Sequence, residues 1–163
     1  MKLTVRPNHR LARWMYRGAR PNRLARPMNV VTAWLSTSGI WPGRMVTLQV
    51  PGRRTGRTTS LPLVMADYQG ARYLVSMLGQ DANWVRNVRA AGGAVTLEHG
   101  RRDQVVLVEV PPAERAPILR RYLEVAPGAR AHVPVPQRAP LEDFAAIAAA
   151  YPVFRITEPA EDR

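Results

Sequence analysis

Residues 52–59, which read GRRTGRTT, combine the side chains and the backbone freedom that bind an anion. Gly52 and Gly56 can adopt backbone angles that other residues rarely reach, so successive N–H groups can point into one concavity. The arginines add permanent charge and forked donors, and the threonines add hydroxyl groups. The candidate anion-binding residues are Arg53, Arg54, Thr55, Gly56, Arg57 and Thr59. This composition predicts a site for a phosphate or a similar anion.

Two apolar runs flank these residues and decide which kind of anion site they form. Residues 46–50 and 58–65 are rich in β-branched residues and leucine, which predicts two strands joined as a hairpin. A Walker P-loop and a Rossmann fingerprint both require a helix that starts after the glycines. The hairpin therefore excludes both nucleotide-binding motifs. An ordinary basic turn on a solvated surface is the alternative interpretation.

The sequence G-R-R-T-G followed by a Leu-Pro-Leu strand resembles the phosphate-binding turn of the deazaflavin-dependent nitroreductase and quinone reductase family. The resemblance continues through residues 75–79 (VSMLG) and 81–87 (DANWVRN), and it extends from about residue 46 to residue 157. Members of this family bind coenzyme F420. The resemblance implies that residues 52–57, here called the arginine turn, neutralise the phosphodiester and glutamyl tail of that coenzyme, with Arg44 as a further candidate.

The same resemblance implies which residues surround the deazaflavin ring. They are Ser76, Met77, Asn83, Trp84 and Asn87. Ser76 and the backbone at Met77 would form hydrogen bonds with the polar edge of the ring, and the two asparagines would orient it. Trp84 would stack against the ring, because two flat apolar rings gain contact area and a favourable offset geometry. Alternatively, Trp84 anchors its helix in the core and Asn87 is a solvated helix residue.

The sequence departs from the family pattern where nitroimidazole-reducing members bind their substrate. Met77 stands where those members carry a lysine, and the Pro- and Gly-rich residues 126–136 replace their tyrosines. These departures argue against nitroimidazole reduction. His132 lies in this segment and is the candidate proton donor to a reduced substrate, because imidazole ordinarily titrates near neutrality; a solvated surface histidine is the alternative. Tyr122 and Tyr151 are weaker candidates, since burial in a helical pattern explains each of them.

The remaining sequence offers none of the common catalytic arrangements. It has no cysteine, no G-x-S-x-G motif and no pair of carboxylates in an apolar context. Its histidines, at positions 9, 99 and 132, lie far apart, so no metal site is predicted. Such a sequence favours a cofactor enzyme, in which the coenzyme performs the hydride chemistry and the protein supplies binding and orientation.

Positive charge is concentrated near the N-terminus. The formal net charge is +12, and half of the 24 basic residues precede Asp67, the first acidic residue. Residues 8–20 predict a helix whose arginines lie opposite Leu11, Trp14 and Met15, as in a helix that rests on a membrane surface. The alternative is a helix that packs on the domain or on the second subunit of a homodimer. The sequence contains no recognisable secretory signal and no run long enough to span a bilayer.

The hydrophobic pattern predicts one domain over residues 41–163, preceded by a basic helical arm over residues 1–40. Besides the hairpin, strands are expected at residues 71–76, 94–98, 104–110 and 153–157, and helices at residues 28–38, 81–91, 112–125 and 141–150. Poor alternation in residues 94–110 predicts that both faces of that hairpin are partly covered. Hairpin-connected strands predict an antiparallel sheet or barrel of the α+β class. The family resemblance implies a split β-barrel of about six mostly antiparallel strands with flanking helices.

These features predict an oxidoreductase that transfers a hydride from reduced coenzyme F420 to a quinone, an activated alkene or a nitro-type small molecule. We expect it in the cytoplasm, or peripherally on the inner face of the cell membrane. The first alternative is an FMN-binding split-barrel oxidoreductase, because the phosphate of FMN suits the same turn. The second is a nucleic-acid-binding barrel. No nucleic acid is expected as a partner, because the neutral remainder of the chain lacks an aromatic stacking platform on a basic strand face.

Overall fold

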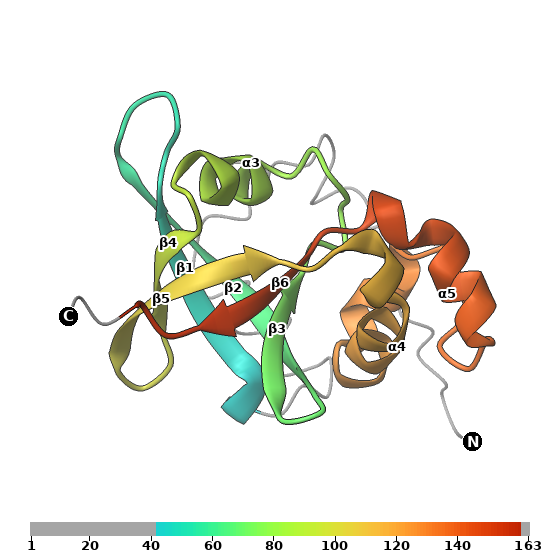
Figure 1. Cartoon of the computed structure of the whole chain (residues 1–163). Coiled ribbons are helices and arrows are strands. Elements are labelled where there is room, and N and C mark those ends of the chain that lie inside the picture. The colour runs from blue at the N-terminus through green and yellow to red at the C-terminus, as the bar shows by residue number, and fades with distance from the viewer. Residues whose placement is uncertain (1–41, 161–163) are drawn as a thin grey trace, which may run out of the picture.

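Six antiparallel strands close into a barrel in the order β1-β2-β3-β6-β5-β4, as expected for a split barrel (Figure 1). The computed structural model describes residues 42–160, so the helices expected at residues 8–20 and 28–38 lie outside the described residues. The strands are β1 (Met45–Pro51), β2 (Thr58–Tyr68), β3 (Ala71–Val75), β4 (Ala94–Glu98), β5 (Arg102–Glu109) and β6 (Val153–Thr157). The helices are α3 (Asn83–Ala90), α4 (Ala116–Val125) and α5 (Leu141–Ile147), with short 3₁₀ helices at Pro42–Arg44, Pro112–Glu114, Pro127–Ala131 and Ala148–Ala150.

Strand β1 shows how the sequence closes the barrel. Its side chains alternate, so that Val46, Leu48 and Val50 are buried while the residues between them are only partly covered. It pairs with β2 on one side and with β4 on the other, and Leu48 lies opposite Leu61 in β2 and Leu97 in β4. A strand with two hydrogen-bonded neighbours and an apolar inner face fixes the register of the whole ring.

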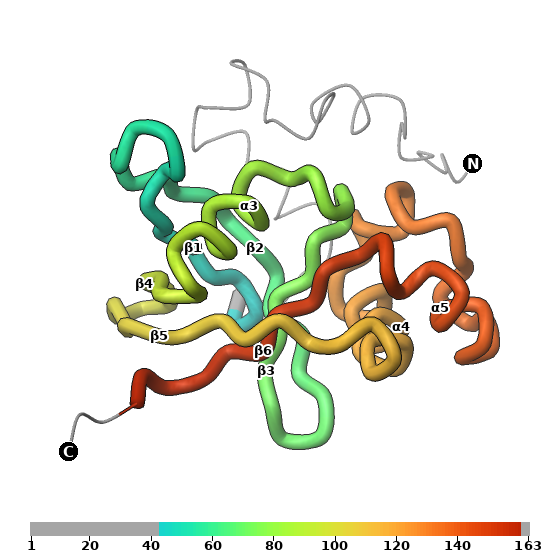
Figure 2. The backbone as a smooth tube through the Cα atoms, turned by 45° about the horizontal axis from the view of Figure 1, so that its top comes forward, coloured from blue at the N-terminus to red at the C-terminus, as the bar shows by residue number. Residues whose placement is uncertain are grey.

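Helix α3 closes one end of the barrel, and Figure 2 shows it lying across β1 and β4. Its Trp84, Val85 and Val88 belong to the same apolar cluster as the inward side chains of the strands. The helix then enters β4 through Gly93, whose φ is +86°. A Cβ atom there would lie 2.4 Å from the carbonyl oxygen of Leu107, so only glycine allows this close approach.

A second apolar cluster lies outside the barrel, where α4 packs on β2 and β3 and α5 packs on α4. Val64 and Ala66 of β2 face these helices, while Met65 between them faces the barrel interior, so this part of β2 is buried on both faces. The outer face of the hairpin at residues 94–110 is partly covered, as expected, at Thr96 and Val106, which are half-buried. The cover is incomplete, because Val108 on the same face is 50% exposed.

The single helix expected at residues 112–125 is divided in two. A 3₁₀ helix covers Pro112–Glu114, α4 begins at Ala116, and the buried Arg115 lies at the junction. Among residues 42–160, no helix has the length and apolar character needed to cross a membrane.

Candidate functional site

The arginine turn connects β1 to β2 and is held closed by its own backbone. The N–H of Gly52 donates to the carbonyl of Arg57 at 2.8 Å, and the N–H of Gly56 donates to the carbonyl of Gly52 at 2.8 Å. Gly56 has a φ of +70°, which side-chain-bearing residues rarely adopt. A Cβ atom on Gly52 would lie 3.1 Å from the Arg57 oxygen. Both glycines are therefore needed for this compact turn.

The expected concavity of N–H groups is corrected by these bonds. Besides the two glycines, the N–H of Arg53 donates to Asn87 at 3.2 Å and the N–H of Arg57 donates to the Thr55 hydroxyl at 3.3 Å. Three of the six backbone N–H groups of the turn thus donate within the turn, and a fourth donates to Asn87. The attraction of the turn for an anion depends on the exposed guanidinium groups, which extend from a fixed backbone.

Asn87 of α3 joins the helix to the arginine turn. Its side-chain oxygen accepts hydrogen bonds from both the backbone N–H and the Nη1 of Arg53, the second at 2.9 Å. Asn87 is only 5% exposed, so it is not the solvated helix residue of the alternative interpretation. One turn earlier on the same face lies Asn83, which is half-buried at the start of α3. Helix α3 therefore positions the arginine turn through the Asn87 side chain, whose oxygen is already hydrogen-bonded to Arg53.

Two other predicted residues have structural partners. The Thr59 hydroxyl donates to the carbonyl of Val50 at 3.0 Å, across the β1–β2 ladder. Arg44 forms an ion pair with Asp67, and this hydrogen bond lowers the pKa of the Asp67 carboxyl. Strand β1 separates Arg44 from the arginine turn by about 20 Å at the usual rise per residue. Arg44 is therefore not part of the same anion site, and it lines a different hollow of about 720 Å³ beside α4.

The segment after β3 forms a tight loop around Ser76. This side chain is 1% exposed, and its hydroxyl donates to the carbonyl of Gly79 at 2.7 Å. The Ser76 N–H donates to the carbonyl of Pro152 at 2.9 Å, and the Gly79 N–H donates back to the Ser76 carbonyl at 3.2 Å. In this structure Ser76 shapes the loop that presents Met77, and its hydroxyl is already bonded.

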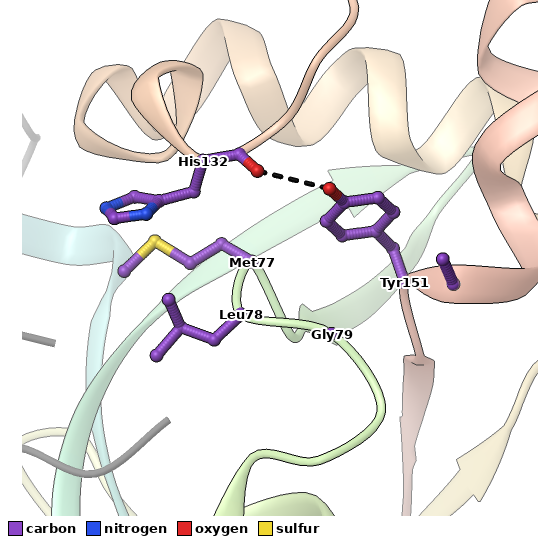
Figure 3. Close-up of a pocket in the computed structure, with 6 residues that line it drawn as sticks. Met77, Leu78, Gly79, His132 and Tyr151 are labelled. Atoms are coloured by element: carbon purple, nitrogen blue, oxygen red, sulfur yellow. Dashed lines mark hydrogen bonds between the residues drawn. The ribbon is translucent and has the colours of Figure 1, made fainter. Parts of the chain in front are cut away.

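This loop forms one wall of a pocket of about 280 Å³, here called the Met77 pocket. Its lining residues are Met77, Leu78, Gly79, His132, Ala150 and Tyr151. Figure 3 shows the imidazole of His132 close to the Met77 side chain, with the Tyr151 ring on the other side. The Tyr151 hydroxyl donates to the backbone oxygen of His132 at 3.1 Å, and burial raises the pKa of this phenol. Polar and apolar atoms contribute about equally to the exposed lining of this pocket, which includes an imidazole and a neutral phenol.

Trp84 packs among the apolar side chains of the barrel cluster. It is 8% exposed, belongs to the barrel cluster, and lies 5.6 Å from Phe154 between ring centroids, with the planes tilted by 56°. It does not line the Met77 pocket. This environment suits a core anchor, and contact with a coenzyme ring stays a prediction.

The sequence analysis named Met77 and His132 as candidate site residues. The structure places them in one pocket, although they are far apart in sequence. It undervalued Tyr151, because burial alone explained a tyrosine in a helical pattern. The residue instead precedes β6 with an extended backbone. The useful signal was Pro152, which ends a helix at or before the preceding residue.

Known proteins resemble this chain at two levels, a family profile and solved structures. The profile of the F420H(2)-dependent quinone reductase family matches residues 25–134. Curated protein sequences give no match. A solved F420-H2 dependent reductase, FDR-A, is 18% identical over 72% of this chain and 96% of its own, with a TM-score of 0.48. A protein of unknown function from Agrobacterium tumefaciens, Atu2129, is 13% identical over 72% of this chain and 49% of its own, with a TM-score of 0.53.

At 13% identity, the similarity to Atu2129 concerns the fold alone. The family profile spans more than half of the chain and includes the arginine turn, α3 and His132. The chain therefore belongs to the F420H2-dependent quinone reductase family, and it is an oxidoreductase that uses coenzyme F420.

Proposed function

We propose that this reductase transfers a hydride from reduced coenzyme F420 to a neutral, planar, electron-poor acceptor, a quinone or an activated alkene, in the Met77 pocket. The observation that carries the proposal is the lining of this pocket. Apart from His132, it consists of uncharged residues, two of which, Met77 and Leu78, have apolar side chains. Such a surface favours a flat apolar ring and offers no fixed charge to an anionic acceptor.

The described residues suit coenzyme F420. Arg54 and Arg57 are exposed at the arginine turn, and their forked donors match the phosphodiester and carboxylates of its tail. Helix α3 leads from the Met77 loop toward the arginine turn, and Asn87, which contacts Arg53, lies about 6 Å along the helix from Asn83. We infer that the tail binds at the turn, with Thr55, Gly56 and Thr59 nearby, and that the ring binds toward Ser76, Met77 and Asn83.

The reduced deazaflavin supplies the hydride when it is bound. The chain contributes binding, orientation and a proton. In our proposal the arginine turn binds the charged tail, the loop at Met77 orders the acceptor, and the imidazole of His132 gives a proton to the acceptor atom that gains negative charge. Tyr151 holds the backbone of His132 in place through its hydrogen bond.

Nitro-type acceptors have less support than quinones and alkenes. A nitro group that is being reduced gains charge on two oxygens, which a nearby lysine would stabilise. Met77 supplies no such charge, and the described arginines nearest to it in sequence, Arg72 of β3 and Arg86 of α3, are exposed and do not line the pocket. We therefore expect slower turnover of a 2-nitroimidazole than of a quinone of similar size.

Binding and turnover assays test this proposal directly. Oxidised F420 and FMN are titrated separately into the protein, and the absorbance of reduced F420 is then followed with 1,4-naphthoquinone, cyclohexenone or a 2-nitroimidazole. We expect tight binding of F420 and the fastest oxidation with naphthoquinone. Exclusive binding of FMN would favour the alternative cofactor, and turnover with the nitro compound alone would contradict the proposed acceptor class.

The arm at residues 8–20 lies outside the described residues, and its membrane contact and its role in a homodimer remain proposals. The segregated arginines support an interfacial helix, which would bring the enzyme to apolar acceptors. Flotation with anionic vesicles compares the full chain with one that begins at Pro27. Salt-sensitive binding of the full chain alone is the expected result, and equal behaviour of the two would assign the arm to packing or assembly.

A further inference from the structure

Arg115 is a buried arginine that does not itself line the Met77 pocket. Arg115 is 3% exposed, and its guanidinium is surrounded by acceptors. Its Nε donates to the carbonyl of Val110 at 2.8 Å, and its Nη2 donates to the Glu109 carboxylate at 3.2 Å. A charge in this position requires such partners, because burial of an unpaired guanidinium is costly.

The remaining bonds of Arg115 reach the wall of the pocket. Its Nη1 lies 3.1 Å from the carbonyl oxygen of Ala148, 3.5 Å from that of Ala149 and 3.4 Å from that of Tyr151. These carbonyls surround Ala150 and Tyr151, the two wall residues from this part of the chain. The planar fork of arginine therefore sets the backbone path from which the Tyr151 ring extends.

Glu109 connects Arg115 to the opposite wall. Its carboxylate also accepts hydrogen bonds from Arg89 of α3, at 3.0 and 2.5 Å. Arg89 donates to the side-chain oxygen of Gln80 at 2.7 Å, and the amide of Gln80 donates to the carbonyl of Ala149 at 2.5 Å. Because Gln80 directly follows Gly79, this chain of contacts ties the Met77 loop to the Ala149 backbone.

The two walls approach each other closely at this point. A Cβ atom on Gly79 would lie 3.3 Å from the carbonyl oxygen of Ala150. A small shift of either wall would therefore change the width of the pocket. The network closes on itself through Arg115, Glu109, Arg89, Gln80 and the carbonyl of Ala149, and we call it the Arg115 network.

We propose that Arg115, Glu109, Arg89 and Gln80 are positioning residues that fix the spacing of the two pocket walls and thereby the orientation of the acceptor. None of them lines the pocket, so they act through the backbone of residues 148–151 and the loop at Gly79. The inference rests on the proposed function, since it concerns the acceptor pocket of that reaction. It predicts an effect on the acceptor without an effect on coenzyme affinity.

Gln80 offers the cleanest test, because it is exposed and its replacement should leave the fold intact. In Gln80→Glu the side chain still accepts from Arg89 but can no longer donate to Ala149. Gln80→Ala removes both contacts. Arg86→Ala is the matched control, because Arg86 lies on the same helix as Arg89 and its ion pair with Asp81 is exposed and outside the network.

Two measurements are made on each variant. Amide hydrogen exchange reports the N–H of Tyr151, which donates to the carbonyl of Ala148 at 3.3 Å. Steady-state kinetics with reduced F420 and 1,4-naphthoquinone report kcat and KM. For Gln80→Glu and Gln80→Ala we expect faster exchange at Tyr151 and about a tenfold fall in kcat/KM for the quinone, since an orientation error of about 1 Å can cost a hundredfold. Thermal stability, F420 affinity and the control should stay unchanged.

Arg115→Lys completes the series, because lysine keeps the charge but cannot reach all of the carbonyls at once. It should impair the quinone reaction more than Gln80→Glu does. Unchanged exchange and unchanged kinetics in both Gln80 variants would overturn the positioning role. If the wild type oxidises no acceptor, the proposed function fails separately, and the exchange data still decide whether the network fixes the wall.

Discussion

The arginine turn and the Met77 pocket are built in opposite ways. The turn is exposed, local in sequence and closed by hydrogen bonds among its own residues. The pocket is assembled from three distant segments whose backbones depend on buried partners, including Ser76 and Arg115. The charge on the turn can therefore change without disturbing the fold. The shape of the pocket, in contrast, depends on many contacts at once.

The largest effect should come from the pocket. In His132→Gln we expect kcat with naphthoquinone to fall by about a hundredfold, because a positioned proton donor contributes at least that much. The dissociation constant of F420 should not change. Tyr151→Phe, which loses only the bond to the His132 backbone, should have an intermediate effect. Wild-type turnover in His132→Gln would remove the imidazole from the chemistry and leave the pocket a binding surface.

Substitutions in the arginine turn should weaken F420 binding and leave kcat unchanged. Arg54→Ala combined with Arg57→Ala should weaken F420 binding by more than tenfold, since each charge-assisted contact is worth on the order of 1.5 to 3 kcal/mol. The melting temperature and kcat at saturating coenzyme should stay constant. Arg101→Ala combined with Arg102→Ala removes the same charge from the exposed β4–β5 turn and should leave affinity unchanged. An equal loss in both pairs would show that net charge, and not the turn, attracts the coenzyme.

A smaller effect on F420 binding is expected at Asn87, the residue of α3 that holds the arginine turn. Asn87→Ala removes the acceptor for both donors of Arg53 and should weaken F420 binding by about three- to tenfold, with a modest loss of stability. Asn87→Asp keeps an oxygen at the same place and should restore most of the affinity. Titration of F420 into the three proteins measures this directly. Equal affinity in Asn87→Ala would mean that the turn holds its shape without α3.

The smallest effect concerns acid stability beside the pocket. The hydrogen bond from Arg89 holds the pKa of the Glu109 carboxyl below its ordinary value of 4.5. The unfolded chain therefore takes up this proton first as the pH falls, so the stabilisation is present above about pH 4.5 and is lost below it. Urea unfolding between pH 6 and pH 3 should show a shallower decline for Glu109→Gln than for the wild type. Glu158→Gln, in an exposed position beyond β6, should follow the wild type.

The sequence sufficed for features that neighbouring residues determine. The glycines at 52 and 56 and the flanking β-branched runs predicted the hairpin, and apolar runs bounded by prolines and glycines located the six strands of residues 42–160. Met77 and His132 entered the candidate site because the family resemblance marked the segments that carry them. The hairpin could be predicted locally because its two glycines bond within the turn itself.

The rest depended on contacts between distant residues. Arg53 meets Asn87 and Gln80 meets Ala149 across 34 and 69 positions, and no local pattern connects either pair. Arg115 looked like a helix residue, although it ends a 3₁₀ helix and is buried among carbonyls. Trp84 shows the limit most plainly. A large aromatic on an amphipathic helix looks the same in sequence whether it contacts Phe154 or a ligand.

The closure of the barrel bears on how copies of the chain can meet. Each strand in residues 42–160 is hydrogen-bonded on both sides, and β4 returns to β1. An open sheet has edge strands whose unpaired N–H and C=O groups can pair with a strand of another chain, which is a common route to aggregation. The described part of this chain presents no such template. Self-association of the folded barrel therefore has to use side-chain surfaces or the exchange of a whole element, and concentrating the protein should not recruit it into extended sheets.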